Sequence, residues 1–368
     1  MSWLIAGCVL PSMAVCWIAS FAVRRWGRQV GLVDRPGHRK IHAEPMPTSG
    51  GLAIWLGIVL PFAFGELALR MLEAQPSLAA ALPQLIAPHV TGLIQQSGRL
   101  WGILGGGTVL MLLGLADDRV GLDWRLRLTV QTAVAIVMVH LGWRATLFID
   151  MPWLTATLSV LWIVGLINSF NMLDNMDGLS AGVAAIAAAM FATMMLLTHR
   201  PDNNQPQLFV AGFLFVIVGS LCGFLWHNRP PARLFMGDAG SYLIGYLLAI
   251  GTLTATFAGA NLPRHAILAP LCVLAVPLYD TATVVAIRLR EGRSPFVGDK
   301  SHFSHRLVEL GLSKPRAVLT IYLATATCGL GALLLGQLNP LGASIVFLMV
   351  GCTLALVAIL ETVGRRRR

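Results

Sequence analysis

Eleven long apolar runs occupy most of this 368-residue chain, and they limit its fold more than any other feature. A helix needs about 20 apolar residues to cross a bilayer core, where its backbone hydrogen bonds must be satisfied without water. Hydrophobic residues make up 56% of the sequence and charged residues only 12%, against about 25% charged in soluble domains. The sequence therefore predicts an all-α, polytopic membrane protein with about 11 transmembrane helices, folded as a single domain over residues 1–368. The predicted spans cover residues 3–23, 49–69, 99–116, 127–143, 153–170, 179–198, 207–226, 239–258, 265–287, 317–337 and 341–361.

The distribution of Lys and Arg among the loops predicts the orientation. With the N-terminus outside, the inner loops and the C-terminal tail hold 22 of the 27 Lys and Arg residues. Positive residues accumulate in short loops on the cytoplasmic side, so the C-terminus is expected in the cytoplasm. Membrane orientation accounts for the formal net charge of +10, and no nucleic-acid partner is expected.

Four polar stretches fall on this same inner side, although the acidic residues played no part in assigning it. Their common location predicts one composite active site at the cytoplasmic face of the membrane. The stretches are Asp117-Asp118, the run from Asn168 to Asp177, the segment from Asn228 to Asp238, and the loop over residues 288–316. The first inner loop adds several basic residues, which are interpreted as orientation charges rather than ligands. They are Arg35, His38, Arg39, Lys40 and His42.

The run from Asn168 to Asp177 lies between two apolar runs and is the most polar part of the predicted membrane region. Asn168, Asn171, Asp174 and Asp177 are spaced by three, a spacing that makes residues neighbours on a helix surface. A charge buried in a membrane costs about 2.5–3.5 kcal/mol on insertion scales. These residues are therefore expected to form the rim of an active site, on one half of a helix face, rather than to fill space.

Each of the other three stretches has a structural alternative when it is taken alone. Asp117 and Asp118 repel each other unless a cation or a proton intervenes, but they could also end a helix with Arg119 as a counter-ion. Asp238 could cap the helix that follows it. The late loop presents His302, His305 and Arg306 within one turn, as donors to a diphosphate or as a solvated basic loop.

Together the four stretches predict a particular chemistry. Carboxylate and amide oxygens suit Mg²⁺, with Mn²⁺ as the alternative, and basic side chains suit phosphates. Transfer of a phosphoryl group between a soluble nucleotide and a membrane lipid requires both, because such catalysis consists mainly of positioning and charge neutralisation. A magnesium-dependent phosphotransferase at the lipid boundary is therefore expected.

The assembled motifs resemble the polyprenyl-phosphate N-acetylhexosamine-1-phosphate transferase superfamily, and within it the bacterial undecaprenyl-phosphate N-acetylglucosamine-1-phosphate transferases. The resemblance extends from His38 to about Leu312. It rests on Ala116-Asp117-Asp118-Arg119, on Asn-x-x-Asn-Met-x-Asp-x-x-Asp-Gly at 168–178, on Phe235-Met236-Gly237-Asp238-Ala239-Gly240-Ser241, and on His302-x-x-His305-Arg306-Leu307.

This resemblance implies a function and a set of site residues. The enzyme would join a UDP-sugar, UDP-GlcNAc in the simplest case, to undecaprenyl phosphate in the bacterial cytoplasmic membrane, release UMP and so initiate a lipid-linked cell-envelope glycan. Asn171 and Asp238 match the metal ligands, and Asp117, Asp118 and Asp174 match the catalytic carboxylates. The residues that match the substrate-binding positions are Asn168, Asp177, Asn228, His302, His305 and Arg306. A homodimer is left open.

The chain departs from the pattern of the superfamily at two places. Asn175 follows Asp174 where the superfamily usually has Gly, and the late loop has Ser304 where many members have a further His. The second departure bears on which sugar is used.

Two other functions remain as alternatives at this point. One is the phospho-N-acetylmuramoyl-pentapeptide transferase of the same superfamily. The other is a secondary transporter, although transporters place their polar residues near the midplane of the bilayer and the polar stretches here lie at the ends of spans.

Overall fold

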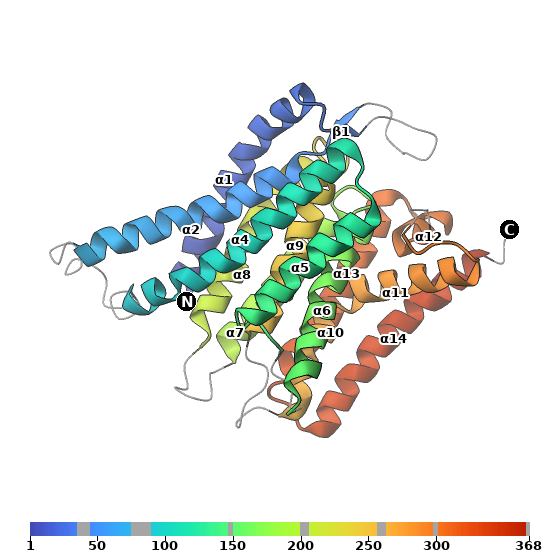
Figure 1. Cartoon of the computed structure of the whole chain (residues 1–368). Coiled ribbons are helices and arrows are strands. Elements are labelled where there is room, and N and C mark those ends of the chain that lie inside the picture. The colour runs from blue at the N-terminus through green and yellow to red at the C-terminus, as the bar shows by residue number, and fades with distance from the viewer. Residues whose placement is uncertain are drawn as a thin grey trace.

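The computed structural model describes residues 1–34, 45–74, 90–145, 150–198, 206–255, 263–296 and 301–365. Within these ranges the regular structure is helical, apart from the short antiparallel pair of β1 (Val33–Asp34) and β2 (Met46–Pro47). The all-α prediction is therefore confirmed. The predicted basic residues between Arg35 and His42 lie outside the described ranges. Figure 1 shows a bundle of long helices, with the N-terminus at one end and the C-terminus toward the other. The helices are α1 (Ser2–Gln29), α2 (Gly50–Ala74), α4 (Val90–Val120), α5 (Trp124–His140), α6 (Pro152–Leu173), α7 (Leu179–Leu197), α8 (Leu208–Asn228), α9 (Gly237–Thr254), η2 (Arg264–Leu268), α10 (Ala269–Val273), α11 (Ala275–Arg290), α12 (Phe303–Glu309), α13 (Lys314–Leu334) and α14 (Pro340–Arg365).

Every predicted apolar run contains a helix, but not every helix is long and apolar enough to cross a membrane. Among the described residues, 8 helices are, or up to 9 if one bent pair counts as a single span. The 17 residues of α5 fall short of the usual length, and α9 begins with a polar turn that contains Asp238. The number 11 and the orientation therefore stay predictions.

The predicted span over residues 265–287 is a bent pair of helices in the structure. The segments Arg264–Val273 and Ala275–Arg290 meet at 66°. Pro277 lies at the start of α11, where it cannot supply the N–H that a continuous helix would donate to Val273. Because α11 is turned away from α10, it runs beneath α12 at the end of the bundle where the polar stretches meet (Figure 1).

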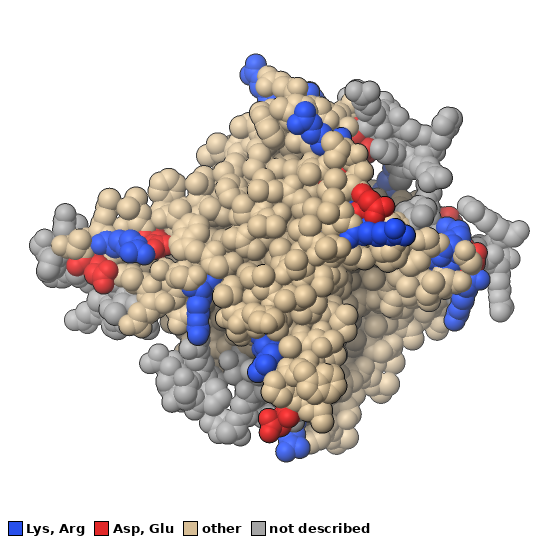
Figure 2. Space-filling view, in the orientation of Figure 1, with Lys and Arg blue, Asp and Glu red and all other residues tan. Residues whose placement is uncertain are grey.

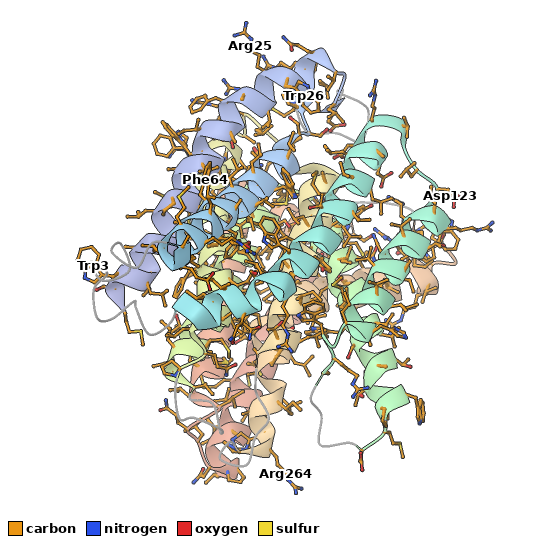
Figure 3. The ribbon with its side chains drawn as sticks, turned by 60° about the vertical axis from the view of Figure 1, so that its left-hand side comes forward. Trp3, Arg25, Trp26, Phe64, Asp123 and Arg264 are labelled. Carbon is orange, nitrogen blue, oxygen red and sulfur yellow. The ribbon has the colours of Figure 1, made fainter. Side chains whose placement is uncertain are left out.

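The outer surface of the bundle is apolar over a wide area. Figure 2 shows a broad uncharged face on which most of the acidic and basic side chains lie toward the edges. Figure 3 places Arg25 and Trp26 at one end of the molecule and Arg264 at the other, and Phe64 and Trp3 between them are exposed. Such a belt between charged ends is what a multi-pass membrane protein presents to lipid.

Helix α9 lies at the centre of this arrangement. It packs against α4, α6 and α2, and every residue from Ala239 to Thr252 is buried. Glycines on the neighbouring helices allow the close approach, because a Cβ at Gly51 would lie 2.2 Å from the Gly240 nitrogen and one at Gly114 would lie 2.3 Å from the Ala239 nitrogen. The first turn of α9 is thereby fixed between α2 and α4.

Candidate active site

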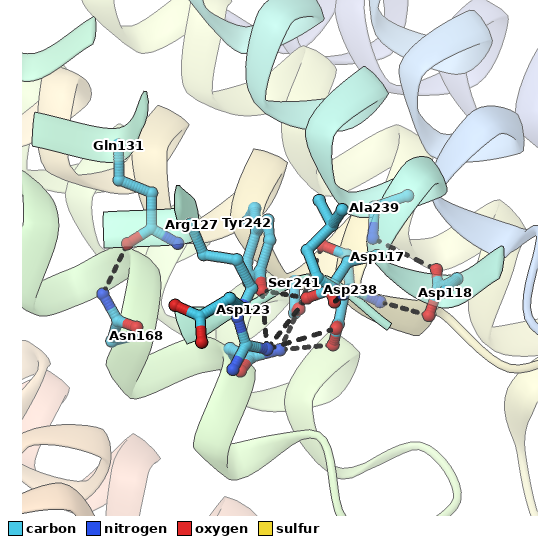
Figure 4. A network of polar contacts seen from close by, with 12 residues as sticks. Asp117, Asp118, Asp123, Arg127, Gln131, Asn168, Asp238, Ala239, Ser241 and Tyr242 are labelled. Carbon is cyan, nitrogen blue, oxygen red and sulfur yellow. Dashed lines mark hydrogen bonds and ion pairs between the residues drawn. The ribbon is translucent and has the colours of Figure 1, made fainter. Parts of the chain in front are cut away.

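The acidic residues of α4 and α9 meet at the first turn of α9. One oxygen of Asp117, Oδ2, accepts hydrogen bonds from Arg127 Nη1 and from the Tyr242 hydroxyl, both at 2.8 Å. The other oxygen, Oδ1, accepts the Leu122 amide at 2.8 Å. The same Nη1 of Arg127 lies 4.0 Å from Asp238 Oδ2, so one guanidinium links the two carboxylates (Figure 4). The prediction that Asp117 and Asp238 lie together is borne out by this geometry, but their chemical roles stay predictions.

Asp118 holds the N-terminus of α9 from outside the helix. Its oxygens accept the backbone amides of Asp238 at 3.1 Å and Ala239 at 3.4 Å, two donors that a helix start leaves without a partner. Gly237 has a φ of +69°, and a Cβ there would lie 2.4 Å from Asp118 Oδ2. The cap of α9 is therefore Asp118 rather than Asp238, and the Asp238 carboxylate remains available on the other side.

Asn171 reaches that available carboxylate from α6. Its Nδ2 donates to Asp238 Oδ1 at 2.6 Å and to the Ser241 hydroxyl at 3.1 Å. Rotation of the amide by 180° would present Oδ1 toward Asp238 instead, which is the orientation that a shared metal ion requires. The two residues that resemble metal ligands are thus in contact.

The four residues spaced by three do not share one helix face. Helix α6 ends at Leu173, and Asp174 caps it with a ψ of 58°, so Asp174 and Asp177 lie in the turn that follows. Asn168 points toward α5, where its Nδ2 donates to Gln131 Oε1 at 2.7 Å. The helix-face interpretation is therefore wrong, because the chain turns after Leu173.

Asp174 lies among other acidic groups in this turn. Burial, together with the negative charges of Asp238 and Asp177, raises the pKa of its carboxyl to about 8. A cation beside these carboxylates would have the opposite effect, because it favours the ionised form. The arrangement is thus unfavourable for three negative charges unless a positive ligand is present.

Asp177 and Asn228 tie the loops of the site together. Asp177 Oδ2 accepts the Ala232 amide at 3.0 Å. Asn228 Oδ1 accepts the Gly178 amide at 3.0 Å, while its Nδ2 donates to the Leu234 carbonyl at 2.9 Å. Both amide atoms of Asn228 are engaged with backbone, so in this structure it joins the α6–α7 and α8–α9 connections.

The late segment docks on α11. His302 Nδ1 lies 2.9 Å from Asp280 Oδ2 and its Nε2 lies 3.5 Å from Arg288 Nη2, while Arg306 Nη2 donates to the Thr283 hydroxyl at 3.1 Å. His302 and Arg306 are both buried, and His305 is partly exposed. The predicted donors thus lie on α12 and at the residue before it, but His302 is turned toward α11.

The two departures from the superfamily pattern touch each other. The Ser304 hydroxyl donates to Asn175 Oδ1 at 2.5 Å, and Asn175 Nδ2 donates to the Met172 carbonyl at 2.9 Å. This contact joins α12 to the turn that contains Asp174 and Asp177.

Several residues of the site were missed by sequence reasoning. Arg127 and Tyr242 complete the surroundings of Asp117, and Asp280 supports His302. Arg127 at the start of an apolar run and Asp280 inside one were signals that could have been used, because ionisable residues inside predicted spans mark functional sites by default. Tyr242 gave no such signal in an otherwise apolar helix.

The donor set fits a magnesium ion that is shared with a substrate. Among the described residues no group of three or more His, Cys, Asp or Glu side chains forms a metal site alone. Mg²⁺ commonly takes one or two carboxylates from the protein and completes its shell with water and phosphate oxygens. Asp238 with Asn171, beside Asp117 and the electrostatically strained Asp174, is a donor set of that kind.

Carboxylates, amides and a guanidinium gather at one end of an apolar helix bundle, which is the architecture of a multi-pass membrane protein with a polar site at one end. Sequence comparison identifies the particular family. A family model described as "Glycosyl transferase family 4" matches residues 100–256, which include Asp117, Asp174 and Asp238. The chain belongs to this glycosyl transferase family.

Curated relatives extend the match over most of the chain. The "Probable undecaprenyl-phosphate N-acetylglucosaminyl 1-phosphate transferase" of Bacillus subtilis is 31% identical over 334 residues, covering 89% of this chain and 83% of the relative. The "Decaprenyl-phosphate N-acetylglucosaminephosphotransferase" of Mycobacterium tuberculosis is 33% identical over 348 residues, covering 88% and 80%. The "Undecaprenyl-phosphate alpha-N-acetylglucosaminyl 1-phosphate transferase" of Escherichia coli K12 is 30% identical over 321 residues, covering 83% and 77%. The resemblance stated from the motifs is confirmed.

Proposed function

We propose that this protein transfers N-acetylglucosamine 1-phosphate from UDP-GlcNAc to undecaprenyl phosphate, releasing UMP and initiating a lipid-linked cell-envelope glycan. The membership of the family and the names of three relatives support this reaction. The structural observation that carries it is the meeting of Asp117, Asp238, Asn171 and Arg127 at the first turn of α9.

The reaction balances as an exchange of one phosphoanhydride bond for another. A lipid phosphate oxygen attacks the sugar-bearing phosphorus of the UDP-sugar and forms the new P–O bond of the lipid diphosphate. The bond between that phosphorus and the bridging oxygen breaks, and UMP leaves with the electron pair. Because little covalent chemistry is left to the protein, its contribution is positioning and charge stabilisation.

The carboxylates receive different roles in this proposal. Asp238 and Asn171 would hold Mg²⁺, or Mn²⁺ in its place, and the bound ion would neutralise charge on the diphosphate. Asp118 keeps the first turn of α9 in place. Asp117 is engaged by three donors and therefore orients Arg127 rather than acting as a free base in this arrangement.

Arg127 gains a role that the sequence did not assign to it. Its guanidinium is partly exposed and lies between two carboxylates. From this place it can donate two parallel hydrogen bonds to the oxygens of a phosphate. Asp174, Asp177 and Asn228 line or support the same end of the bundle, and His305 and Arg306 approach it from α12.

The orientation in the membrane is part of the proposal. The 11 spans, an outer N-terminus and an active site on the cytoplasmic side of the bacterial inner membrane rest on the distribution of 22 of 27 basic residues. UDP-sugars are cytoplasmic metabolites in the reaction that the resemblance implies, so the two inferences agree. A homodimer stays open.

The alternatives are less well supported. The three relatives described above carry N-acetylglucosamine rather than N-acetylmuramoyl-pentapeptide in their names. The polar residues lie at helix ends, with the described contacts concentrated at one end of the bundle, unlike the midplane sites of secondary transporters.

A transfer assay tests the proposal. Purified protein is incubated with sugar-labelled UDP-GlcNAc, undecaprenyl phosphate and Mg²⁺, and label in the organic phase is counted. Chelation of divalent ions should abolish the transfer and added Mg²⁺ should restore it. The assay is repeated with labelled UDP-N-acetylmuramoyl-pentapeptide. Transfer of label to the organic phase from this substrate, but not from UDP-GlcNAc, would favour the phospho-N-acetylmuramoyl-pentapeptide transferase.

A further inference from the structure

Asp280 is a buried acid in the middle of α11 that the proposed reaction does not use. It is 1% exposed and lies in a helix that is otherwise largely apolar. Its Oδ1 accepts the Phe303 amide at 2.7 Å and its Oδ2 lies 2.9 Å from His302 Nδ1. A buried carboxylate is costly unless charged or hydrogen-bonding partners compensate it, and both partners of Asp280 come from the start of α12.

The contact with Asp280 determines which ring nitrogen of His302 carries a proton. A carboxylate accepts hydrogen bonds only, so Nδ1 must carry the proton. In the neutral ring Nε2 is then an acceptor, and it faces the Arg288 guanidinium at 3.5 Å. Arg288 in turn donates to the Pro295 carbonyl at 2.7 Å. The order of donors and acceptors is therefore consistent from Asp280 to the segment that precedes α12.

Helix α11 makes two further contacts with α12. Thr283 lies three residues after Asp280 and accepts a hydrogen bond from Arg306, and residues three apart share a helix surface. Tyr279 contacts the Phe303 ring edge to face at 6.3 Å between ring centres. On its other side α12 is tied to Asn175 through Ser304. Helix α12 also packs against α13 and α14, so removal of Asp280 would loosen the start of α12, at His302 and Phe303, and would leave the rest of the helix attached.

We propose that Asp280 is a positioning residue for the nucleotide-sugar, acting through His302 to hold α12, and with it His305 and Arg306, next to the carboxylate cluster. The substrate named here rests on the proposed function. The inference reverses the expectation that His302 itself contacts the diphosphate, because both ring nitrogens of His302 face groups of α11.

Substitution of Asp280 by Asn tests the proposal with little change of volume. An amide can donate to Nδ1, which moves the proton to Nε2 and directs an N–H toward Arg288, as happens when a carboxylate beside a histidine is replaced by an amide. Asp280→Asn should raise KM for UDP-GlcNAc by about tenfold or more, the size of one lost charge-assisted hydrogen bond. KM for undecaprenyl phosphate should stay within about twofold. Glu291→Gln, an exposed carboxylate of the same connection, is the matched control.

Two variants of His302 give an independent result. Asn places a donor near the position of Nδ1, whereas Gln places one near Nε2. His302→Asn should therefore lose less affinity for UDP-GlcNAc than His302→Gln. The opposite order, or an unchanged KM in Asp280→Asn, would overturn the proposal, and so would an equal rise of both KM values.

Limited trypsin digestion of the intact protein in nanodiscs reports on α12 without any turnover. Cleavage after Arg306, which is buried in α12, should accelerate in Asp280→Asn and His302→Gln but not in Glu291→Gln. If the wild type shows no transfer from UDP-GlcNAc, the proposed function fails while the digestion still decides the position of α12. Equal digestion of all four proteins would refute the role of Asp280.

Discussion

At the scale of single residues, the site depends on carboxylates whose neighbours differ. Asp118 has a structural role in this arrangement, because its carboxylate accepts hydrogen bonds from two backbone amides of α9. Asp117 is saturated by Arg127, Tyr242 and Leu122. Asp238 is the member with a partly exposed side chain and an amide partner that can turn. The three aspartates therefore differ in what they can bind because their hydrogen-bond partners differ, although their side chains are the same.

Asp238→Ala and Asp117→Ala should each reduce transfer by at least about a hundredfold, the loss typical when one preorganised electrostatic group is removed. The measurement is the appearance of sugar label in the organic phase. Asp123→Asn should retain transfer, because Asp123 is an exposed cap of α5 and Asn caps equally well. Near-normal turnover in either alanine variant, with intact elution behaviour, would show that its role is assigned wrongly.

The stability of the metal-free protein should fall with rising pH because of Asp174. Its pKa is raised from 3.8 to about 8 in the folded state, so folding favours the protonated carboxyl and loses that advantage as pH rises through this window. Between pH 6 and 8, in chelator, the melting temperature of the wild type should fall more than that of Asp174→Asn. Added Mg²⁺ should reduce the difference at pH 8. Parallel pH profiles for the two proteins would contradict the placement of Asp174.

At the scale of elements, the site is built on the start of α9 because glycines on α2 and α4 let three helices meet there. Gly114 illustrates the constraint. A Cβ at this position would lie 2.3 Å from the Ala239 nitrogen and 2.4 Å from the Ala239 Cα, which are backbone atoms that cannot rotate away. The position of Asp117 and Asp118 relative to α9 therefore depends on a residue without a side chain.

Gly114→Ala should separate α4 from α9 and lower both stability and transfer. Overpacking in a tight core costs about 1–3 kcal/mol, and the displaced Asp118 would release the α9 amides as well. Gly105→Ala on the same helix is the matched control, because nothing lies within 4 Å of its Cβ position. That substitution should be neutral or stabilising by up to about 1 kcal/mol through helix propensity. Thermal melting and the transfer assay report the two effects, and equal behaviour of the two variants would argue against the close contact.

The contact between Ser304 and Asn175 should appear as coupling between two elements. In a double-mutant cycle with Ser304→Ala and Asn175→Ala, neighbouring partners typically deviate from additivity by about 0.5–3 kcal/mol. The quantity to compare is kcat/KM for UDP-GlcNAc. Ser304→Ala combined with Thr129→Val, which removes an exposed hydroxyl on α5, should be additive. Additivity in both cycles would mean that the α12 segment is held without this bond.

At the scale of the whole molecule, apolar runs predicted where helices occur because burial in lipid leaves few other solutions. The same runs could not show that α11 is turned from α10, since a proline inside a span is compatible with both a straight and a bent course. The apolar runs also do not predict which residues far apart in the sequence contact each other. That Asp118 caps α9, or that Asp280 receives His302, follows from packing in three dimensions and from no local pattern.

The candidate site was predictable to the extent that its chemistry is unusual for a membrane segment. Asp117, Asn171, Asp174 and Asp238 could be singled out because acids and amides are rare next to long apolar runs, and the resemblance to the superfamily then gave each of them an expected role. Tyr242 was not, because a tyrosine in an apolar helix is ordinary. For His302, sequence shows which groups can donate but not the direction in which they point, and in the structure both ring nitrogens face α11.

Thiol labelling in intact cells tests the orientation of the molecule. Arg25 and Arg264 lie at opposite ends of the bundle (Figure 3). A membrane-impermeant maleimide should label Arg264→Cys from outside and should reach Arg25→Cys only after the cells are opened. A variant in which the native cysteines are replaced serves as the background. Labelling of both positions from the same side would exclude the proposed topology.

The cap that α4 supplies to α9 has a consequence for how the protein is made. Asp118 and its two amide partners are separated by more than a hundred residues, and Ser304 must then reach back to Asn175. A ribosome that has delivered the chain through α8 has inserted the carboxylates of Asp117 and Asp174 but not the first turn of α9, against which Asp117 and Asp118 pack. Premature termination therefore leaves an inert fragment in the membrane, and catalytic competence arises only when the chain is nearly finished.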